Sequence, residues 1–288
     1  MLESDAGLRN THKFYEMNQE EMQLFQMKRL RRAYELKKDD WFINHDPSQL
    51  RWSYLLQGEM HCSLHQSMFC LCLEKLTTDE QAKKWVPLAK SMRITGAYAQ
   101  TELGHGSDIA GLQTTATFDE ATDEFIINTP TIQATKFWPG DLGFFSSHAI
   151  VFAKLIIDEN KYGVHPFLVQ LRDTDTWKFV KGVKAGDIGP KFGYHSKNNG
   201  WCTFDNVRIP RDQMLMRYTQ VEKDGTFSIA GDVRALYSIM MDIRVQLVGH
   251  SNDYLERALT IALRYSVIRR QFKNNLSNSK METKLLDY

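Results

Sequence analysis

The spacing of apolar and polar positions changes twice along this chain of 288 residues. From residue 12 to residue 94, apolar side chains recur at roughly helical spacing among charged ones, and the most apolar run covers 50–76. A turn is expected around Pro47. Thr77 and Thr78 each precede an acidic or amide residue by three positions, which is the spacing of a capping box. The pattern therefore predicts an N-terminal helical domain.

The middle of the chain has a different composition. Twelve of the 17 glycines and five of the seven prolines lie between Gly96 and Pro210, which argues against long helices. Short apolar runs separated by polar turns predict an antiparallel β domain. The expected strands are Thr114–Phe118, Glu124–Asn128, Ala149–Ile157 and Val164–Leu171, with shorter candidates at Trp177–Val180 and Trp201–Phe204.

Helical periodicity returns near the end of the chain. No proline follows Pro210, and apolar residues keep a helical spacing over 233–272. Gly225 and Gly231 mark the expected linker. The predicted domains are a helical domain at 1–94, a β domain at 95–225 and the start of a helical bundle at 226–288.

Composition and charge exclude several classes of function. The formal net charge is +1, so no strong field favours nucleic acid or a membrane surface. No apolar run approaches the 18 residues of a membrane span, and the first residues lack a signal-peptide pattern. Four cysteines without metal spacing are typical of reduced core thiols in an intracellular protein. His61 and His65 could share a helix face, but two histidines make an incomplete metal site, so no metal is expected.

Polar and glycine residues are concentrated in the stretch TGAYAQTELGHGSDIAG, from Thr95 to Gly111. Alternation around Tyr98 predicts a short strand, and Gly104 and Gly106 then allow tight turning and close approach to a ligand. The spacing is not a dinucleotide fingerprint, which needs G-x-G-x-x-G. Spacing alone leaves two interpretations open, a polar loop facing a ligand and a plain glycine-rich turn.

Several longer segments carry a family resemblance. AYAQTELGHGS, TTATFDEATDEFIINTPT, KFWPGDLG, GDIGPKFG, DNVRIPRDQMLMR and RYSVIRRQF occur in this order between Gly96 and Phe272. Together they resemble the acyl-CoA oxidase family, the flavin-dependent peroxisomal branch of the acyl-CoA dehydrogenase superfamily. The resemblance is weaker before Thr77. It implies an α+β multidomain fold, in which a β domain sits between an N-terminal helical domain and a C-terminal helical bundle that is truncated here.

The resemblance also implies a reaction. Family members use FAD and O2 to convert a fatty acyl-CoA to trans-2-enoyl-CoA, with release of H2O2, in peroxisomal fatty acid β-oxidation. A carboxylate removes the α-proton, and the β-hydrogen leaves as hydride to the flavin. A homodimer in the peroxisome, without a bound nucleic acid, is the expected state.

Nine residues match the positions at which the family contacts FAD. Thr101 matches a contact to the flavin pyrimidine edge, where a donor stabilises negative charge. Trp138 matches an apolar wall beside the ring, and Arg269 matches an arginine that reaches the pyrophosphate of a neighbouring subunit's FAD. The implied cofactor residues are Tyr98, Ala99, Gln100, Thr101, Gly106, Ser107, Trp138, Gly140 and Arg269.

The KFWPGDLG segment departs from the commoner family form, which has two tryptophans and two adjacent glycines. Phe137 and Asp141 replace one of each. Asp141 is therefore expected to place a carboxylate near the cofactor.

Substrate contacts are implied for positions that meet the CoA portion, and among them Arg244 keeps the family's arginine. The implied residues are Arg234, Ala235, Leu236, Tyr237 and Arg244. Glu102 is expected to be structural. The family's catalytic glutamate follows a CGGHGY-like motif that these 288 residues do not contain, so no catalytic base is expected within them.

Three functional hypotheses follow. The first is an acyl-CoA oxidase represented by an incomplete chain, for which turnover by residues 1–288 alone is doubtful. The second is a non-catalytic subunit that binds FAD or acyl-CoA, or an inactive truncated form. The third is an acyl-CoA dehydrogenase that uses an electron-transfer partner, which the GHGS and FWPG segments disfavour.

Overall fold

The computed structural model describes residues 4–36, 63–232, 234–235, 238–273 and 281–288. The chain divides into two compact units, Met1–Ile239 and Met240–Tyr288, which are described separately. The turn expected around Pro47 and the first part of the apolar run 50–76 lie outside the described residues.

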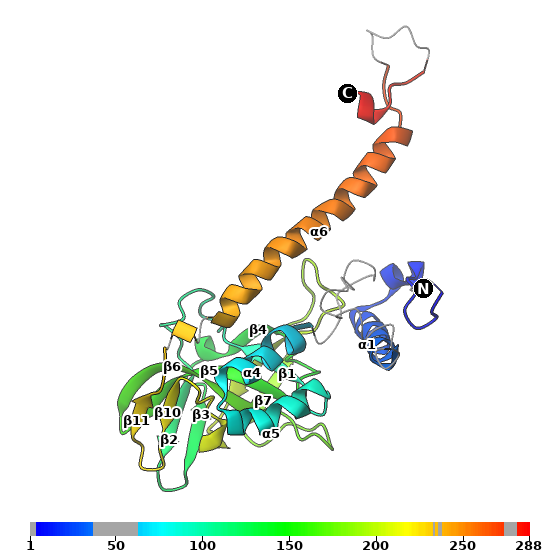
Figure 1. Ribbon diagram of the computed structural model, residues 1–288. Coiled ribbons are helices and arrows are strands. Elements are labelled where there is room, and N and C mark those ends of the chain that lie inside the picture. The colour runs from blue at the N-terminus through cyan, green and yellow to red at the C-terminus, as the bar shows by residue number, and fades with distance from the viewer. Residues whose placement is uncertain (1–3, 37–62, 233, 236–237, 274–280) are drawn as a thin grey trace. The chain divides into compact units, whose positions relative to one another are not determined.

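Helices precede the sheets in the first unit, as the periodicity predicts. They are η1 (His12–Glu16), α1 (Gln19–Leu36), the π-helical turn η2 (His65–Cys70), α4 (Leu71–Leu76) and α5 (Asp79–Lys90) (Figure 1). The capping box is confirmed at Thr78, whose hydroxyl accepts from Gln81 N while Gln81 Oε1 accepts from Thr78 N. The Gln81 amide also donates to the carbonyls of Asp212 and Met214, so the start of α5 is tied to a segment far along the chain.

Eleven strands form the described β structure. The six-stranded sheet contains β1 (Gly96–Ala99), β2 (Thr115–Asp119), β3 (Glu124–Asn128), β5 (His148–Ile157), β6 (Asn160–Gln170) and β9 (Val207–Pro210). The three-stranded sheet contains β4 (Lys136–Gly140), β7 (Val183–Asp187) and β8 (Asn199–Phe204). A hairpin of β10 (Thr219–Val221) and β11 (Phe227–Ile229) completes the set, and the turns η3 (Ile132–Ala134) and η4 (Arg211–Gln213) connect strands.

The larger sheet is mixed, which corrects the expectation of a purely antiparallel β domain. β5 runs antiparallel to β6 but parallel to β1 and to β2. Parallel neighbours need a long crossover connection, and the chain between β1 and β5 supplies one by building β2, β3 and β4. Because β5 is covered on both faces, its run HAIVFAKLII is apolar almost throughout and buried along most of its length.

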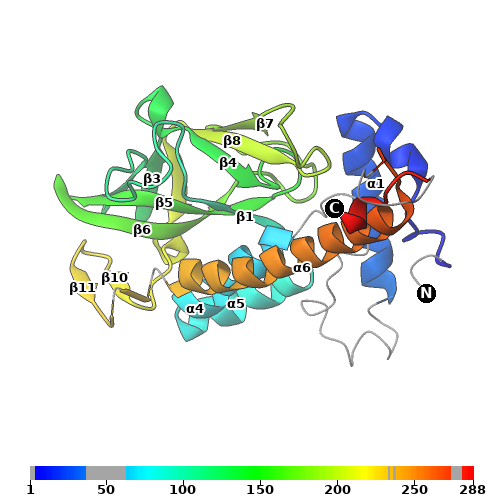
Figure 2. The same cartoon turned by 90° about the horizontal axis from the view of Figure 1, so that it is seen from above.

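The two sheets share one core. Figure 2 shows β4, β7 and β8 layered against the larger sheet. Cys202 and Phe204 of β8 belong to the same buried cluster as Phe125, Ile127 and Val151 of the larger sheet. The alternating burial of β2 and β3, with Phe118 and Phe125 side by side, follows from their period-two sequence pattern.

The predicted strands agree with the structure except in two details. The connection between the strands expected at Ala149–Ile157 and Val164–Leu171 is only two residues long, because Asp158 and Glu159 adopt φ values of 48° and 65° that suit a tight hairpin. Trp177–Val180 does not form a strand. Trp177 has φ of 60°, which interrupts the extended backbone, and only a single bridge joins Arg172 to Phe179.

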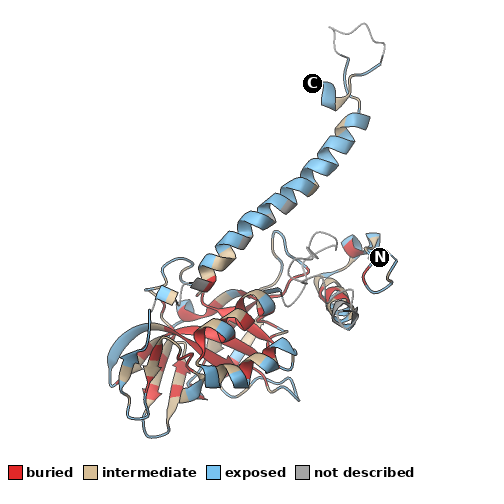
Figure 3. Cartoon of the chain, in the orientation of Figure 1, coloured by how far each residue is buried: buried red, intermediate tan, exposed pale blue. Residues whose placement is uncertain are grey.

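The second unit is mainly helical. It holds almost all of α6 (Ser238–Ile268), followed by the short turn η6 (Leu285–Asp287). Most of the described side chains of α6 are exposed, including apolar ones such as Leu255, Leu259 and Leu263 (Figure 3). In the described parts of the chain, no helix has the length and apolar character needed to cross a bilayer.

Candidate functional site

Two segments singled out by sequence lie side by side in the structure. The backbone N–H of Phe137, in β4, donates to the carbonyl of Thr101 at 3.0 Å. Thr101 lies two residues after the end of β1 at Ala99, and Trp138 is the next residue after Phe137. Within the described residues, no hydrogen bond engages the Thr101 hydroxyl. The structure thus places the segment with the available Thr101 hydroxyl next to strand β4, which carries Phe137 and Trp138.

Trp138 has an unusual conformation. Its φ is 82°, in a region that bulky residues rarely occupy, and its side chain is 54% exposed. The strand is irregular here, since the pairing with β8 shifts register between Phe137 and Gly140. The amide of Asn199, in β8, donates to the Trp138 carbonyl at 2.8 Å and so holds this peptide. A backbone outlier fixed by a buried partner, with an exposed indole, is typical of a functional position.

The other residues of the first predicted segment divide into two groups. Tyr98, Ala99 and Gln100 are buried, and the Tyr98 hydroxyl donates to the Gln100 side chain at 3.1 Å. Gly106 and Ser107 are exposed on the loop that follows. A Cβ at Gly106 would meet no atom within 4 Å, so nothing in the described structure crowds this position. The loop residues can contact a ligand directly, whereas the buried residues can reach one only through their backbone.

The end of β4 faces inward. A Cβ at Gly140 would lie 2.6 Å from Leu64 Cδ1 and 3.1 Å from Lys197 Cε, so a larger residue would require these two side chains to move. The Asp141 carboxylate is fully buried and lies 2.7 Å from the Lys197 ammonium, which also donates to Ser63 Oγ at 3.0 Å. Its expected place near the cofactor stays a prediction. The extra charge brought by Asp141 is therefore neutralised inside the protein.

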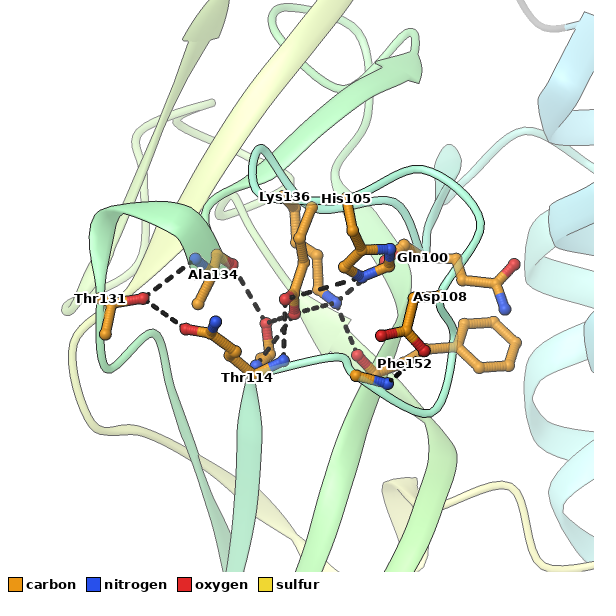
Figure 4. Close-up of polar contacts among 11 residues, drawn as sticks. Gln100, His105, Asp108, Thr114, Thr131, Ala134, Lys136 and Phe152 are labelled. Atoms are coloured by element: carbon orange, nitrogen blue, oxygen red, sulfur yellow. Dashed lines mark hydrogen bonds and ion pairs between the residues drawn. The ribbon is translucent and has the colours of Figure 1, made fainter.

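Glu102 is fully engaged and cannot serve as a base for a substrate. Its carboxylate accepts from Thr114 N, Thr114 Oγ1, Gln113 N and Lys136 Nζ (Figure 4). Burial opposes its ionisation, but the charge of Lys136 and these hydrogen bonds hold the pKa of Glu102 below its usual value. Burial lowers the pKa of Lys136 to about 8, against the opposing charge of Glu102, so both groups are ionised at neutral pH.

The predicted substrate and pyrophosphate residues are divided between the two units and the part of the chain outside the described residues. Arg234 is exposed and pairs with Asp232 at 2.6 Å, and Ala235 is half-buried. Leu236 and Tyr237 lie outside the described residues. Arg244 and Arg269 are exposed residues of the second unit. Their roles stay predictions.

His65 has a structural role rather than a ligand role. Its Nδ1 accepts from Gly96 N–H at 3.0 Å, and its Nε2 donates to the Ala89 carbonyl at 3.0 Å. Burial lowers the pKa of this ring, which keeps it neutral. Its sequence neighbour at the helical spacing, His61, is outside the described residues, and among those described no three His, Cys, Asp or Glu side chains gather as a metal site.

Sequence reasoning missed three residues that shape the site: Lys136, Lys197 and Asn199. Each acts across more than 30 positions of the chain, through partners that no local pattern reveals. The sequence offers one sign of these residues. Lys136 begins the aromatic strand segment KFWPG, and a lysine that is buried in a strand needs a specific partner for its charge.

Three family models match consecutive parts of the chain. They are the acyl-coenzyme A oxidase N-terminal model at residues 1–95, the acyl-CoA dehydrogenase middle-domain model at 97–207 and the acyl-CoA oxidase C-alpha1 model at 237–288. The domain boundaries predicted from sequence stay predictions.

Curated relatives and solved structures agree with these matches. The chain is 46% identical over 243 residues to peroxisomal acyl-coenzyme A oxidase 1 of Arabidopsis thaliana and 44% identical over 246 residues to that of Rattus norvegicus, with 83% and 84% of the chain covered. It covers 36% and 37% of these two relatives, respectively, so it spans little more than a third of their length.

Among solved structures, acyl-CoA oxidase 1 of Arabidopsis thaliana matches the whole chain and 44% of its own, with a TM-score of 0.92 at 40% identity. Acyl-CoA oxidase-2 of Caenorhabditis elegans, solved with FAD, ascaroside-CoA and ATP, matches 96% of this chain and 42% of its own, with a TM-score of 0.87 at 39% identity. From its order of motifs to its fold, this chain belongs to the acyl-CoA oxidase family.

Proposed function

We propose that this chain forms the flavin-contact part of an FAD-dependent acyl-CoA oxidase, a homodimeric peroxisomal enzyme of fatty acid β-oxidation. The enzyme converts acyl-CoA to trans-2-enoyl-CoA and reduces O2 to H2O2. The relatives are named peroxisomal acyl-CoA oxidases, and two of the matched Caenorhabditis elegans structures hold FAD.

One observation carries the proposal: the hydrogen bond from Phe137 N to the Thr101 carbonyl joins the segment with the available Thr101 hydroxyl to the segment with the exposed, conformationally strained Trp138. This pair fits the flavin, which is a flat aromatic ring with hydrogen-bonding groups along one edge. Thr101 would donate to that edge and favour negative charge on it, while the indole would wall the ring from water. When bound, FAD supplies the hydride acceptor and passes the electrons to O2.

Other residues of the chain would hold the phosphates and the substrate. Ser107 and Gly106 stand exposed on the loop, where a hydroxyl and backbone groups can bind polar parts of the cofactor. Arg269 would pair with a pyrophosphate, for which a guanidinium fork is suited, and Arg244 would contact CoA. Glu102 takes no part in proton removal, because both of its carboxylate oxygens already accept hydrogen bonds from other residues of the protein.

The test is a titration with FAD, with replacement of Trp138 by Leu as the diagnostic variant. Trp177 offers a matched control, since it is also exposed and also has positive φ, at 60°, but lies outside the proposed site. Trp138→Leu should weaken FAD binding, and Trp177→Leu should not. Equal effects would refute the assignment. Peroxide release from acyl-CoA, measured with and without an artificial electron acceptor, separates an oxidase from a dehydrogenase.

A further inference from the structure

A buried ion pair joins two residues that are close in sequence to the proposed flavin contacts Thr101 and Trp138. Glu102 follows Thr101 in sequence, and Lys136 precedes Trp138 by two residues. Lys136 Nζ and Glu102 Oε1 are 3.1 Å apart, and the two side chains are 0% and 1% exposed. The pair thus connects the two segments that would touch the cofactor.

Lys136 uses its ammonium group to join three parts of the fold. Besides Glu102, it donates to the Gln100 carbonyl at 3.2 Å and to the Phe152 carbonyl of β5 at 2.7 Å (Figure 4). An ammonium has three donors, so all of them are satisfied. β4, the loop start and the central strand of the larger sheet are therefore held at one point.

Glu102 closes the loop that carries Gly106 and Ser107. The carboxylate sits at the start of the loop and accepts from Gln113 N at 2.8 Å and from Thr114 N at 2.9 Å, at its end. The Thr114 hydroxyl adds a third bond at 2.6 Å. His105 Nε2 lies 3.9 Å from the same carboxylate. Residues 103–112 therefore form a loop whose two ends are held together by the Glu102 carboxylate.

Stability alone does not explain such a pair. The desolvation free energy of the two charges is about as large as the free energy of their attraction, so well-packed apolar residues would stabilise the fold equally well. What the pair adds is geometry, because each bond fixes the direction and distance of its partner. We infer that Lys136 and Glu102 are positioning residues that set the spacing between Thr101 and Trp138, and so the width of the flavin site. This inference rests on the proposed FAD function.

The experiment compares FAD binding by the unaltered chain with that by Lys136→Met, Glu102→Gln and the double variant. Partners that orient a ligand-binding group typically change affinity about 10- to 100-fold, so each single variant should weaken FAD binding by that order. The double variant should be no weaker than the worse single variant, because both break the same link. The visible absorption band of bound flavin should shift, and amide exchange over 103–112 should rise without FAD.

Lys184→Met is the matched control, because it removes an exposed lysine from β7 of the same sheet as Lys136. It should leave binding and spectrum unchanged. If Lys136→Met fails to fold, FAD binding by the isosteric variant Glu102→Gln tests the inference instead. Folded variants with the affinity and flavin spectrum of the unaltered chain would overturn the inference but leave the proposed function standing. No FAD binding by the unaltered chain would overturn both.

Discussion

The Asn199 side chain donates to the carbonyl of Trp138 at 2.8 Å, so a buried amide on β8 holds the strained peptide of an exposed indole on β4. Asn199→Ala should lower the free energy of unfolding by about 1–2 kcal/mol, because the partly buried hydrogen bond to the Trp138 carbonyl is lost. Urea denaturation measures this loss. Asn160→Ala serves as control, since the Asn160 amide also donates to a carbonyl but is exposed. Equal losses in the two variants would contradict this role of Asn199.

The Asp141–Lys197 pair predicts a compensating double variant. Lys197→Met leaves a fully buried carboxylate without its cation and should cost about 3–5 kcal/mol of stability. Adding Asp141→Gly should recover most of this loss. Glycine removes the charge and also relieves the strain of an aspartate at φ of 64°. Chemical denaturation of the two single variants and the double variant tests the coupling, and simple additivity would rule it out.

Burial lowers the pKa of His148 to about 4, from an ordinary value near 6.5. Below pH 6.5 this histidine is protonated in the unfolded chain but stays neutral in the folded chain. The free energy of unfolding therefore decreases as the pH falls from 6.5 to 4. The loss from this ring amounts to about 3 kcal/mol. His148→Gln should flatten the pH dependence by that amount. Unfolding free energies measured across this range decide the matter.

Arg269 and Thr101 should affect the cofactor in different ways. Arg269→Ala removes a charge-assisted contact to phosphate and should weaken FAD retention by about 1.5–3 kcal/mol, or one to two decades in affinity. Arg264→Ala, another exposed arginine of the second unit, is the control. FAD content after dialysis, unchanged in Arg269→Ala, would refute the assigned contact.

Thr101→Ala should change flavin reactivity more than affinity, because the lost donor acts on charge that develops upon reduction. Thr101→Ser keeps the hydroxyl and should behave like the unaltered chain. The reduction potential of bound flavin is the appropriate measurement. A potential that shifts equally in both variants would show that the methyl group, not the hydroxyl, is what matters.

Local sequence signals predicted much of the fold. Thr78 and Gln81 marked the start of α5, and alternation around Phe118 and Phe125 marked a hairpin. The parallel pairing of β1 with β5 could not be predicted in this way, because it depends on which apolar strands meet after a long crossover. Trp177 was misassigned because a bulky aromatic residue favours strands, while its actual φ is left-handed.

Motifs singled out Thr101 and Trp138 as candidate cofactor contacts, and these roles stay predictions. The structure adds that their two segments are adjacent, because Phe137 N donates to the Thr101 carbonyl. Lys136 and Asn199 were not found, because their importance lies in partners on other strands. For Asp141 the sequence predicted a carboxylate near the cofactor but could not reveal its ion pair with Lys197, far along the chain.

The crossover between β1 and β5 has a consequence for how the protein is made. Gly96 pairs with His148, so β1 leaves the ribosome about fifty residues before the strand that completes it. Synthesis proceeds at about 5–20 residues per second, so Ala97 and Ala99 stay unpaired for several seconds until β5 has been synthesised. The hairpin of β2 and β3 can close in the meantime, since its strands are neighbours in sequence. β1, which leads into Thr101, therefore pairs only after the hairpin of β2 and β3 can have closed, and a chaperone that shields β1 would act in this interval.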